Sequence, residues 1–252
     1  MTDQKTMAYI NMFGVLGALP MLCKLDSQAA ALLTGKTPIA LCLTVKNGPA
    51  ATFTFADGGC TIESGEQKCD IKIPFSTCEK FNGMIDGTVT PIPSKGFTKI
   101  GFLTGPFIKL TDRLSAYLRA SESDLADEQF FNISTELMLY VIGGAVAAIG
   151  NYDKIGSFSA SNTPDGIVHL SIKDGPCATV TVRDHKLSAA PGRNGDPRAV
   201  MEFASIKLAR ALFDGKVNSM DCIGKQTITM RGMISMLDNI NRILDRVSVY
   251  LA

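Results

Sequence analysis

The sequence lacks the residues on which several functional classes depend. It has no Trp and only 7% aromatic residues, so we expect no platform on which nucleic-acid bases stack. Its 25 Lys and Arg are matched by 24 Asp and Glu without a long run of one sign, which argues against a nucleic-acid surface. A phosphate loop, a dinucleotide fingerprint and a paired-His metal motif are also missing. We therefore expect no nucleic-acid partner, no metal and no cofactor.

Cysteine and histidine are present, but not in catalytic or metal-binding patterns. The seven Cys are odd in number and contain no Cys-x-x-Cys pair, so neither a disulfide framework nor a zinc site is expected. Buried free thiols in a reducing cytoplasm are the simpler interpretation. The two His, His169 and His185, do not recur elsewhere in the chain and have no evident nucleophile as a partner. We predict no catalytic residue and leave enzymatic activity open.

An apolar run near the N-terminus, Met7–Leu22, has the composition of a signal peptide or a membrane span. A similar apolar run follows residue 127, and Gly17-Ala18 and Leu25-Asp26 align with Gly144-Ala145 and Tyr152-Asp153. A segment repeated in mid-chain is expected to be a domain helix. Neither run contains eighteen uninterrupted apolar residues, so no transmembrane segment is predicted.

The chain contains two copies of one unit. Leu43–Asp57 and Leu170–Asp184 share eight of fifteen residues, and each copy closes on the pattern Asp-Arg-x-Ser-x-Tyr-Leu, at residues 112–118 and 245–251. Two copies are too few for a solenoid, and 252 residues suit two domains. We predict one lobe over residues 1–120 and a second over residues 125–252.

Each copy reads as helix, four strands, helix, strand, helix. The first helices are predicted over Lys5–Cys23 and Asp127–Ala148, and alternating apolar residues predict the strands. The fifth strands are predicted at Ile100 and Phe102 and at Ile228 and Met230. This pattern indicates an α+β fold in which helices cover a five-stranded, mostly antiparallel sheet in each lobe.

Several short motifs are interpreted as structural. Asn47-Gly48 and Asp174-Gly175 predict type I′ turns, and Asp57 and Asp184 are expected to cap the turns after the second strand. Ser76-Thr77-Cys78-Glu79 predicts a capping box in which Ser76 is the N-cap, and Ser205 is the matching cap. The pairs Asp112-Arg113 and Asp245-Arg246 either bridge the two lobes or lie in solvent.

The second copy resembles the sterol carrier protein type 2 (SCP2) family. The resemblance rests on residues 197–203, on the segment Leu212–Lys216, on Ile223-Gly224-Lys225 and on Ile228–Gly232, followed by an amphipathic helix. The first copy follows the same plan through Asp86-Gly87, Gly96 and residues 100–102. The resemblance implies two tandem domains with helices over a hydrophobic tunnel that holds a fatty acyl chain, a sterol or another lipid.

Candidate ligand-binding residues are the apolar side chains that alternation and helical spacing direct inward. Methionine is flexible and suits a cavity for varied apolar ligands, although a packed core uses it equally. In the second copy, the better candidate, these residues are Met201, Phe203, Leu212, Met230, Met233 and Leu237. In the first copy they are Phe75, Phe102 and Phe107, whose bulk could instead fill the same volume.

These observations predict a soluble cytoplasmic protein that binds or carries a hydrophobic small molecule in an apolar cavity. Two alternatives remain at this stage. The first is an accessory or catalytic subunit that uses the same cavity, which requires a titratable group with a perturbed pKa inside it. The second is a protein–protein interaction module with filled cores, and a homo-oligomer is possible in any of these cases.

Overall fold

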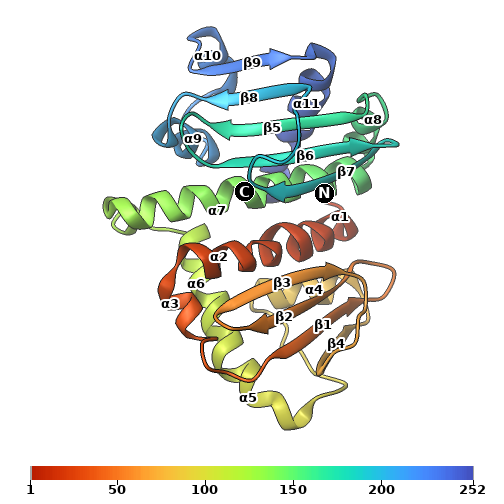
Figure 1. Cartoon of the computed structure of the whole chain (residues 1–252). Helices are drawn as coiled ribbons and strands as arrows, with labels where there is room; N and C mark the ends of the chain where they lie inside the picture. The colour runs from red at the N-terminus through yellow and green to blue at the C-terminus, as the bar shows by residue number, and fades with distance from the viewer. Residues whose placement is uncertain (1, 252) are drawn as a thin grey trace. The chain divides into compact units, whose positions relative to one another are not determined.

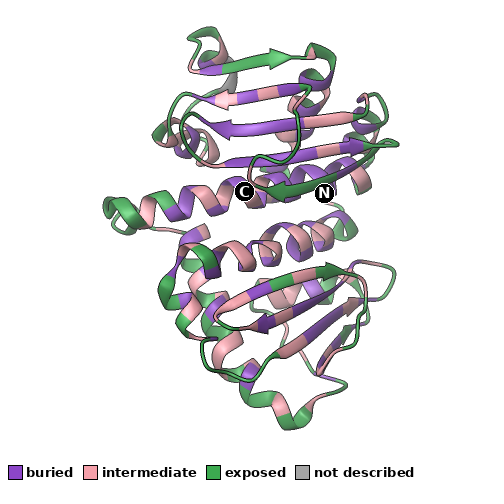
Figure 2. Ribbon diagram, viewed as in Figure 1, coloured by how far each residue is buried: buried purple, intermediate pink, exposed green. Residues whose placement is uncertain are grey.

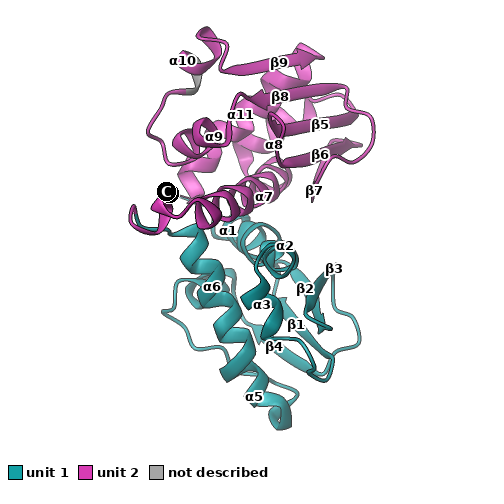
Figure 3. Cartoon of the chain, turned by 60° about the vertical axis from the view of Figure 1, so that its left-hand side comes forward, with its two compact units in different colours: residues 1–121 teal, residues 122–252 magenta. Residues whose placement is uncertain are grey.

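The chain forms two compact units, Met1–Ser121 and Glu122–Ala252 (Figure 3). The structure is a computed structural model that describes residues 2–251, with the backbone alone for Ser219 and Met220. Each unit is a mixed α+β structure with its own sheet and is described by itself.

Unit 1 begins with one continuous helical stretch whose winding changes along its length. It runs through α1 (Gln4–Tyr9), the π-helical η1 (Ile10–Val15), the 3-10 turn η2 (Leu16–Ala18) and α2 (Leu19–Leu25) (Figure 1). Pro20 does not end this stretch, because it lies in the first turn of α2, where a missing N–H costs little. A short helix, α3 (Ser27–Ala31), follows.

The sheet of unit 1 has four strands in the order β3-β2-β1-β4. They are β1 (Ile39–Val45), β2 (Ala50–Ala56), β3 (Gly59–Ser64) and β4 (Ile71–Phe75). Strands β1 and β4 are parallel, and the other pairs are antiparallel. The helices after the sheet are α4 (Cys78–Ile85), η3 (Phe97–Lys99), α5 (Ile100–Phe102), η4 (Leu103–Phe107) and α6 (Ile108–Leu118).

Unit 2 has five strands in the order β7-β6-β5-β8-β9, of which only β5 and β8 are parallel. They are β5 (Gly166–Ile172), β6 (Cys177–Arg183), β7 (Lys186–Pro191), β8 (Ala199–Phe203) and β9 (Ile228–Gly232). The helices are η5 (Asp124–Ala126), α7 (Glu128–Tyr152), α8 (Lys154–Ser161), α9 (Ile206–Phe213), α10 (Ser219–Gly224) and α11 (Ile234–Leu251). Buried residues line the central strands β5, β6 and β8, while β7 and β9 are mostly exposed (Figure 2).

The predicted fifth strand is present in unit 2 as β9, but the prediction for unit 1 is wrong. Ile100 and Phe102 belong to α5, and the edge of β4 is met by a single bridge between Lys72 and Lys95. The bridge between Lys72 and Lys95 corresponds to the pair Val200 and Arg231 of unit 2. By this alignment, Pro74 corresponds to Glu202 and Pro93 to Thr229, and Glu202 and Thr229 pair with each other in unit 2. Proline has no N–H, so neither side can donate to a ladder there.

Two glycines fix this alignment of the units. Gly96 and Gly232 follow the bridge and β9 respectively, with φ of 90° and 93°. A Cβ at either position would collide with the backbone at the start of the neighbouring strand, at Asp70 in unit 1 and at Arg198 in unit 2. Both places therefore require glycine, and Ile92 corresponds to Ile228, four residues before each glycine.

The prediction of type I′ turns at Asn47-Gly48 and Asp174-Gly175 is wrong. Asn47 and Asp174 have positive φ, but Gly48 and Gly175 do not. Pro49 and Pro176 follow them and cannot supply the N–H that closes a two-residue turn at this point. Both central residues have positive φ at Asp57-Gly58 and Asp184-His185, between the second and third strands, so the two Asp are turn residues as expected.

Helix capping matches the prediction in unit 2 and differs by one residue in unit 1. Ser205 caps α9 by accepting from the Leu208 amide at 3.2 Å. In unit 1 the N-cap of α4 is Thr77, not Ser76, and its hydroxyl accepts from the Lys80 amide at 3.3 Å. The helix begins one residue later, so Glu79 lies in its first turn rather than at the reciprocal position of a capping box.

Two helical stretches, Gln4–Leu25 and Glu128–Tyr152, are long and apolar enough to span a membrane by length and composition. Most of each stretch is buried within the structure, as in the core helix of a folded domain. The α7 helix packs on β6 and β7 of its own sheet and against α8 and α11. The absence of a transmembrane segment remains a prediction.

Candidate functional site

An apolar pocket of about 590 Å³ lies in unit 1. Its walls come from the end of α4, the loop over residues 87–93, and the broken helical stretch from α5 to α6. Ile73 of β4 and Val15 and Leu16 of the first helical stretch complete the lining. The remaining apolar lining residues are Met84, Ile85, Val89, Pro91, Pro93, Ile100, Leu103, Phe107, Ile108, Leu114 and Leu118. The volume lies within the range of small-molecule sites, and apolar walls are typical of them.

The missing fifth strand explains why this region of unit 1 is open. In unit 2, Ile228 lies in β9 and is only 3% exposed. In unit 1, the corresponding Ile92 is 74% exposed, and Pro91 and Pro93 beside it line the pocket. The helical stretch that follows is broken by the π-helical η4, which contains Pro106. The departure from the strand and the broken helix lie on two sides of the same pocket.

The few polar groups in the lining are largely satisfied by the protein. Thr104 donates to the carbonyl of Ile100 at 3.2 Å, and Thr111 donates to Ile108 at 2.9 Å. Two charged residues, Asp112 and Arg119, lie at the exposed side of the lining on and after α6. The lining contains no His and no Cys. This arrangement favours an apolar ligand over a polar one.

Of the three residues predicted to line a cavity in the first copy, Phe107 lines the pocket. Phe102 is buried beside it, with ring centroids 6.3 Å apart, and also contacts Phe55 at 5.1 Å. Phe75 packs edge-on against Phe81 at 5.3 Å, on the inner face of β4. The alternative interpretation was that these rings fill the available volume; the structure retains a pocket that Phe107 lines.

The residues predicted for the second copy lie in different environments and do not line either described pocket. Met201, Phe203 and Leu237 are buried in the core, and Phe203 packs against Phe213 at 5.8 Å. Leu212 and Met233 are half-buried, and Met230 is 37% exposed on the edge strand β9. Their role in ligand binding stays a prediction.

An open depression of about 570 Å³ in unit 2 is of a different kind. It lies at the hairpin turn over residues 172–176 and is lined also by Asn132, Glu136 and residues 204–206. The Tyr140 hydroxyl donates to Glu136 at 2.6 Å, and burial together with this carboxylate raises the pKa of Tyr140. The polar, open lining offers no enclosure for an apolar molecule.

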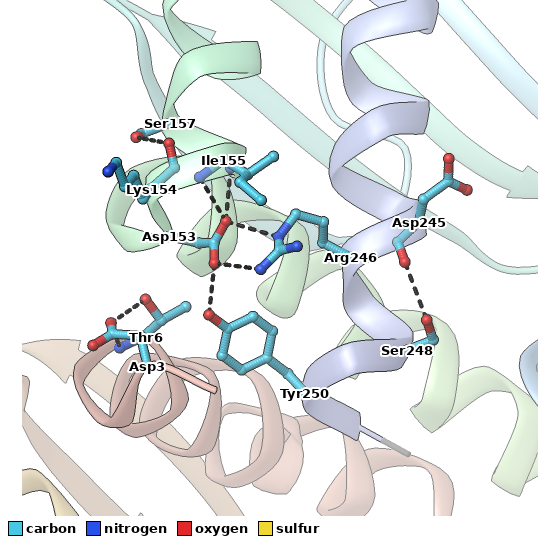
Figure 4. Close-up of polar contacts among 11 residues, drawn as sticks. Asp3, Thr6, Asp153, Lys154, Ile155, Ser157, Asp245, Arg246, Ser248 and Tyr250 are labelled. Atoms are coloured by element: carbon cyan, nitrogen blue, oxygen red, sulfur yellow. Dashed lines mark hydrogen bonds and ion pairs between the residues drawn. The ribbon is translucent and has the colours of Figure 1, made fainter. Parts of the chain in front are cut away.

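A buried carboxylate joins the last helix of unit 2 to the start of α8 (Figure 4). Asp153 accepts from the amides of Ile155 and Gly156 at 2.9 and 2.8 Å and from the Tyr250 hydroxyl at 2.7 Å. The Arg246 guanidinium donates through Nη2 at 2.8 Å. Burial alone raises the pKa of Asp153, but the donors outweigh it and hold the pKa below its ordinary value.

Unit 1 has the same arrangement with looser geometry. Asp26 caps α3 through the Gln28 amide at 2.9 Å, and Arg113 Nε donates to it at 2.6 Å. The Tyr117 hydroxyl donates to Asp26 at 3.3 Å, and burial, reinforced by the Asp26 charge, raises the pKa of Tyr117. The repeated Asp-Arg pairs are therefore divided in their roles, because Asp112 and Asp245 are exposed while the two Arg side chains bind carboxylates. The Arg of each pair binds an Asp of its own unit, so the repeated motif is structural.

Other chemically reactive side chains of the described residues lie apart from the pocket. His169 Nε2 lies 3.2 Å from the carbonyl oxygen of Asn194, and His185 occupies a turn with φ of 60°. Burial raises the pKa of the Cys23 thiol to about 11 and also that of Cys177, which disfavours reactive thiolates. Within residues 2–251 no three His, Cys, Asp or Glu side chains are placed to hold a metal ion.

Sequence patterns missed most of the pocket. Met84, Val89, Leu103, Ile108 and Leu118 line it and were not among the predicted residues. The signal that could have found them is the pair Pro91 and Pro93 at the position of a strand, which excludes regular pairing there.

The chain is similar to solved SCP2 domains. No protein-family model and no curated protein matches it. The UbiJ-SCP2 ubiquinone synthesis protein is 11% identical with a TM-score of 0.33, and 42% of this chain covers 94% of that chain. Sterol carrier protein 2 from Yarrowia lipolytica is 16% identical, with a TM-score of 0.31 and coverages of 40% and 92%. Palmitated SCP2L2 from Aedes aegypti is 14% identical, with a TM-score of 0.32 and coverages of 42% and 90%.

Proposed function

We propose that the protein binds and carries a hydrophobic small molecule, such as a fatty acyl chain or a sterol, in the apolar pocket of unit 1. In this proposal the two units are tandem SCP2-like domains of a cytoplasmic protein. The observation that carries the proposal is the pocket itself, about 590 Å³ of mainly apolar lining beside a sheet that lacks its fifth strand.

The energetics favour an apolar occupant. Removing apolar surface from water contributes about 25 cal/mol per Å² on both ligand and wall. The hydroxyls of Thr104 and Thr111 are already bonded to helix carbonyls, so an apolar chain would not strand them. A polar end of the ligand would lie at the exposed side, near Asp112 and Arg119.

The proposal assigns different roles to the two units. Met84 at the end of α4 lines the pocket, and Leu212 occupies the corresponding place in α9, two residues before Asp214-Gly215. Leu212 is half-buried in unit 2 and lines neither described pocket. A ligand held in unit 1 therefore responds to a change at Met84 and not at Leu212.

The test compares Met84→Trp with Leu212→Trp in the full chain. The chain has no Trp, so each indole is also a single fluorescent reporter. We expect Met84→Trp to weaken binding of a fluorescent fatty acid about tenfold or more, because the indole occupies the ligand's volume. Leu212→Trp is expected to leave the affinity unchanged. Equal affinities in both variants, or no binding by the unmodified chain, would overturn the proposal.

A further inference from the structure

Exposed apolar side chains gather around the pocket of unit 1. Ile92 is 74%, Phe97 63%, Ile100 46% and Ile108 47% exposed. Ile100 and Ile108 also line the pocket, and Ile92 lies between the lining residues Pro91 and Pro93. Phe97 lies in η3, three residues before Ile100, and does not itself line the pocket. We call these four side chains the apolar rim. Single exposed apolar residues are ordinary, but a group beside a pocket indicates an interaction surface.

The charge around the apolar rim is of both signs, with an excess of positive charge. Residues 88–111 contain Lys95, Lys99 and Lys109 and no Asp or Glu, in a chain whose net charge is only +1. Lys99 forms an ion pair at 2.6 Å with Asp70, the residue directly before β4. Asp86 adjoins the lining residues Ile85 and Gly87, and Asp112 and Arg119 line the pocket. When Asp70 and these three groups are counted with the lysines, an excess of one positive charge remains. Apolar side chains flanked by lysines are typical of a segment that lies in the headgroup region of an anionic bilayer.

A second copy of the chain is a poorer partner for this surface. If two apolar rims met face to face, the lysines of both copies would be brought together with fewer acidic than basic residues to offset them. A bilayer with anionic lipid accepts both parts of the surface, because its interior takes the apolar side chains and its headgroups take the lysines.

We infer that the apolar rim docks unit 1 on the surface of an anionic lipid bilayer, with the pocket opening toward the lipid. The inference rests on the proposed function, since it identifies the partner with which the pocket exchanges its ligand. Insertion of Ile92 and Phe97 would remove their side chains from water and place Ile100 and Ile108 at the boundary between pocket and membrane. An apolar ligand could then leave the pocket without crossing water.

The test measures co-sedimentation of the full chain with vesicles of phosphatidylcholine containing about 30% phosphatidylserine. The variant Ile92→Ser/Phe97→Ser changes two exposed residues that do not line the pocket. We expect it to bind these vesicles at least about tenfold more weakly. The matched control is Ile155→Ser/Phe158→Ser in unit 2, whose side chains are 58% and 69% exposed, and it is expected to bind as the unmodified chain does. Lys109→Glu and vesicles of pure phosphatidylcholine are both expected to weaken binding.

Binding of a fluorescent fatty acid in vesicle-free buffer separates this inference from the proposed function. We expect Ile92→Ser/Phe97→Ser to bind the probe as tightly as the unmodified chain. If probe binding is intact but the unmodified chain does not bind vesicles, the docking inference is overturned and the proposed function stands. If vesicle binding depends on Phe97 but no probe binds, the proposed function fails instead. An equal loss of vesicle binding in the unit 2 control would also overturn the docking inference. So would a dimer of the unmodified chain that Ile92→Ser/Phe97→Ser dissociates.

Discussion

Ile92 of unit 1 and Ile228 of unit 2 each lie four residues before a glycine of positive φ, but their environments are opposite. Ile228 is buried in the edge strand β9, and Ile92 is exposed beside a pocket. The difference follows from Pro93 and Pro74 in unit 1, which replace Thr229 and Glu202 and remove two backbone donors. Loss of one edge strand can therefore open a ligand-sized space in one copy of a repeated unit while the other copy keeps its strand.

The comparison also shows what both units retain. In each, an Asp after the first long helix binds an Arg and a Tyr of the last helix. Thr52 and Thr179 likewise anchor the loop that follows the third strand of their own unit. Each hydroxyl donates a hydrogen bond to a carbonyl of that loop and accepts one from an amide of the same loop. The anchors recur where the repeat is strongest, and the difference lies in the segment where the two copies diverge.

The largest expected effect is the loss of folding stability when a buried carboxylate is removed. Asp153→Ala leaves the Arg246 guanidinium and the Tyr250 hydroxyl without their acceptor, and we expect it to destabilise unit 2 by about 3–5 kcal/mol. Asp26→Ala is expected to cost less, because Tyr117 lies 3.3 Å from Asp26 against 2.7 Å in unit 2. Urea unfolding followed by hydrogen exchange in peptides of each unit measures both. Asp245→Ala, at an exposed neighbour of Arg246, is the control and should change stability by less than about 0.5 kcal/mol.

The next largest effect is the difference in stability loss between alanine substitutions at Ile228 and at Ile92. Ile228→Ala should destabilise unit 2 by about 2–5 kcal/mol, because it leaves a cavity under β9. Ile92→Ala should alter unit 1 by less than about 0.5 kcal/mol, because the side chain is mostly in water. The same urea and exchange measurement compares them, and similar losses at the two positions would show that unit 1 keeps a packed edge at Ile92.

Placing the unit 2 residues Glu and Thr at positions 74 and 93 should restore hydrogen bonding along the edge of β4 in unit 1. In Pro74→Glu/Pro93→Thr, two backbone donors return, each bond being worth about 1 kcal/mol. We expect slower hydrogen exchange at the amides of residues 92, 94 and 95, which are present in both proteins. We also expect weaker binding of a fluorescent fatty acid, because a paired strand draws this segment away from the pocket. The reverse change, Thr229→Pro, should speed exchange in β9. Unchanged exchange and binding in the double variant would show that the prolines do not keep the edge open.

The smallest effect is on the pH dependence of unit 2. Because the pKa of Asp153 is lower in the folded state, its contribution to stability is complete above the unfolded pKa of about 3.9. It is lost as the pH falls through that value toward the folded pKa. Asp153→Asn should therefore flatten the decline in stability below about pH 5. Urea midpoints of unit 2 across this range measure the effect, and an equally steep decline in the variant would assign it to other groups.

The sequence predicted the parts of the fold that repeat. Alternation located β4 and β8 at Ile71–Phe75 and Ala199–Phe203, and Ser205 located the start of α9. It failed where one residue changes the available hydrogen bonds, as at Pro49, Pro93 and Thr77. The fifth strand of unit 1 was wrongly predicted because the apolar alternation of Ile100-Gly101-Phe102 is typical of a strand. The structurally equivalent residues of unit 2 lie in its last helix.

The pocket was harder to predict than the fold. Apolar residues that line a cavity and apolar residues that fill a core have the same spacing, so the inward side chains of Met201 and Leu237 could not be told from those of Leu103 and Leu118. The distinction depends on backbone breaks at several places in the chain, at residues 91–93 and in η4, which act together only in three dimensions.

Methyl NMR spectra of the full chain, recorded while a fatty acid is added, test the difference between the units most directly. We predict shift changes for the methyl groups of Met84, Leu103, Ile108 and Leu118 in unit 1, with those of Met201, Ile228 and Leu237 in unit 2 unchanged. Changes confined to unit 2, or no change in either unit at saturating ligand, would contradict the account.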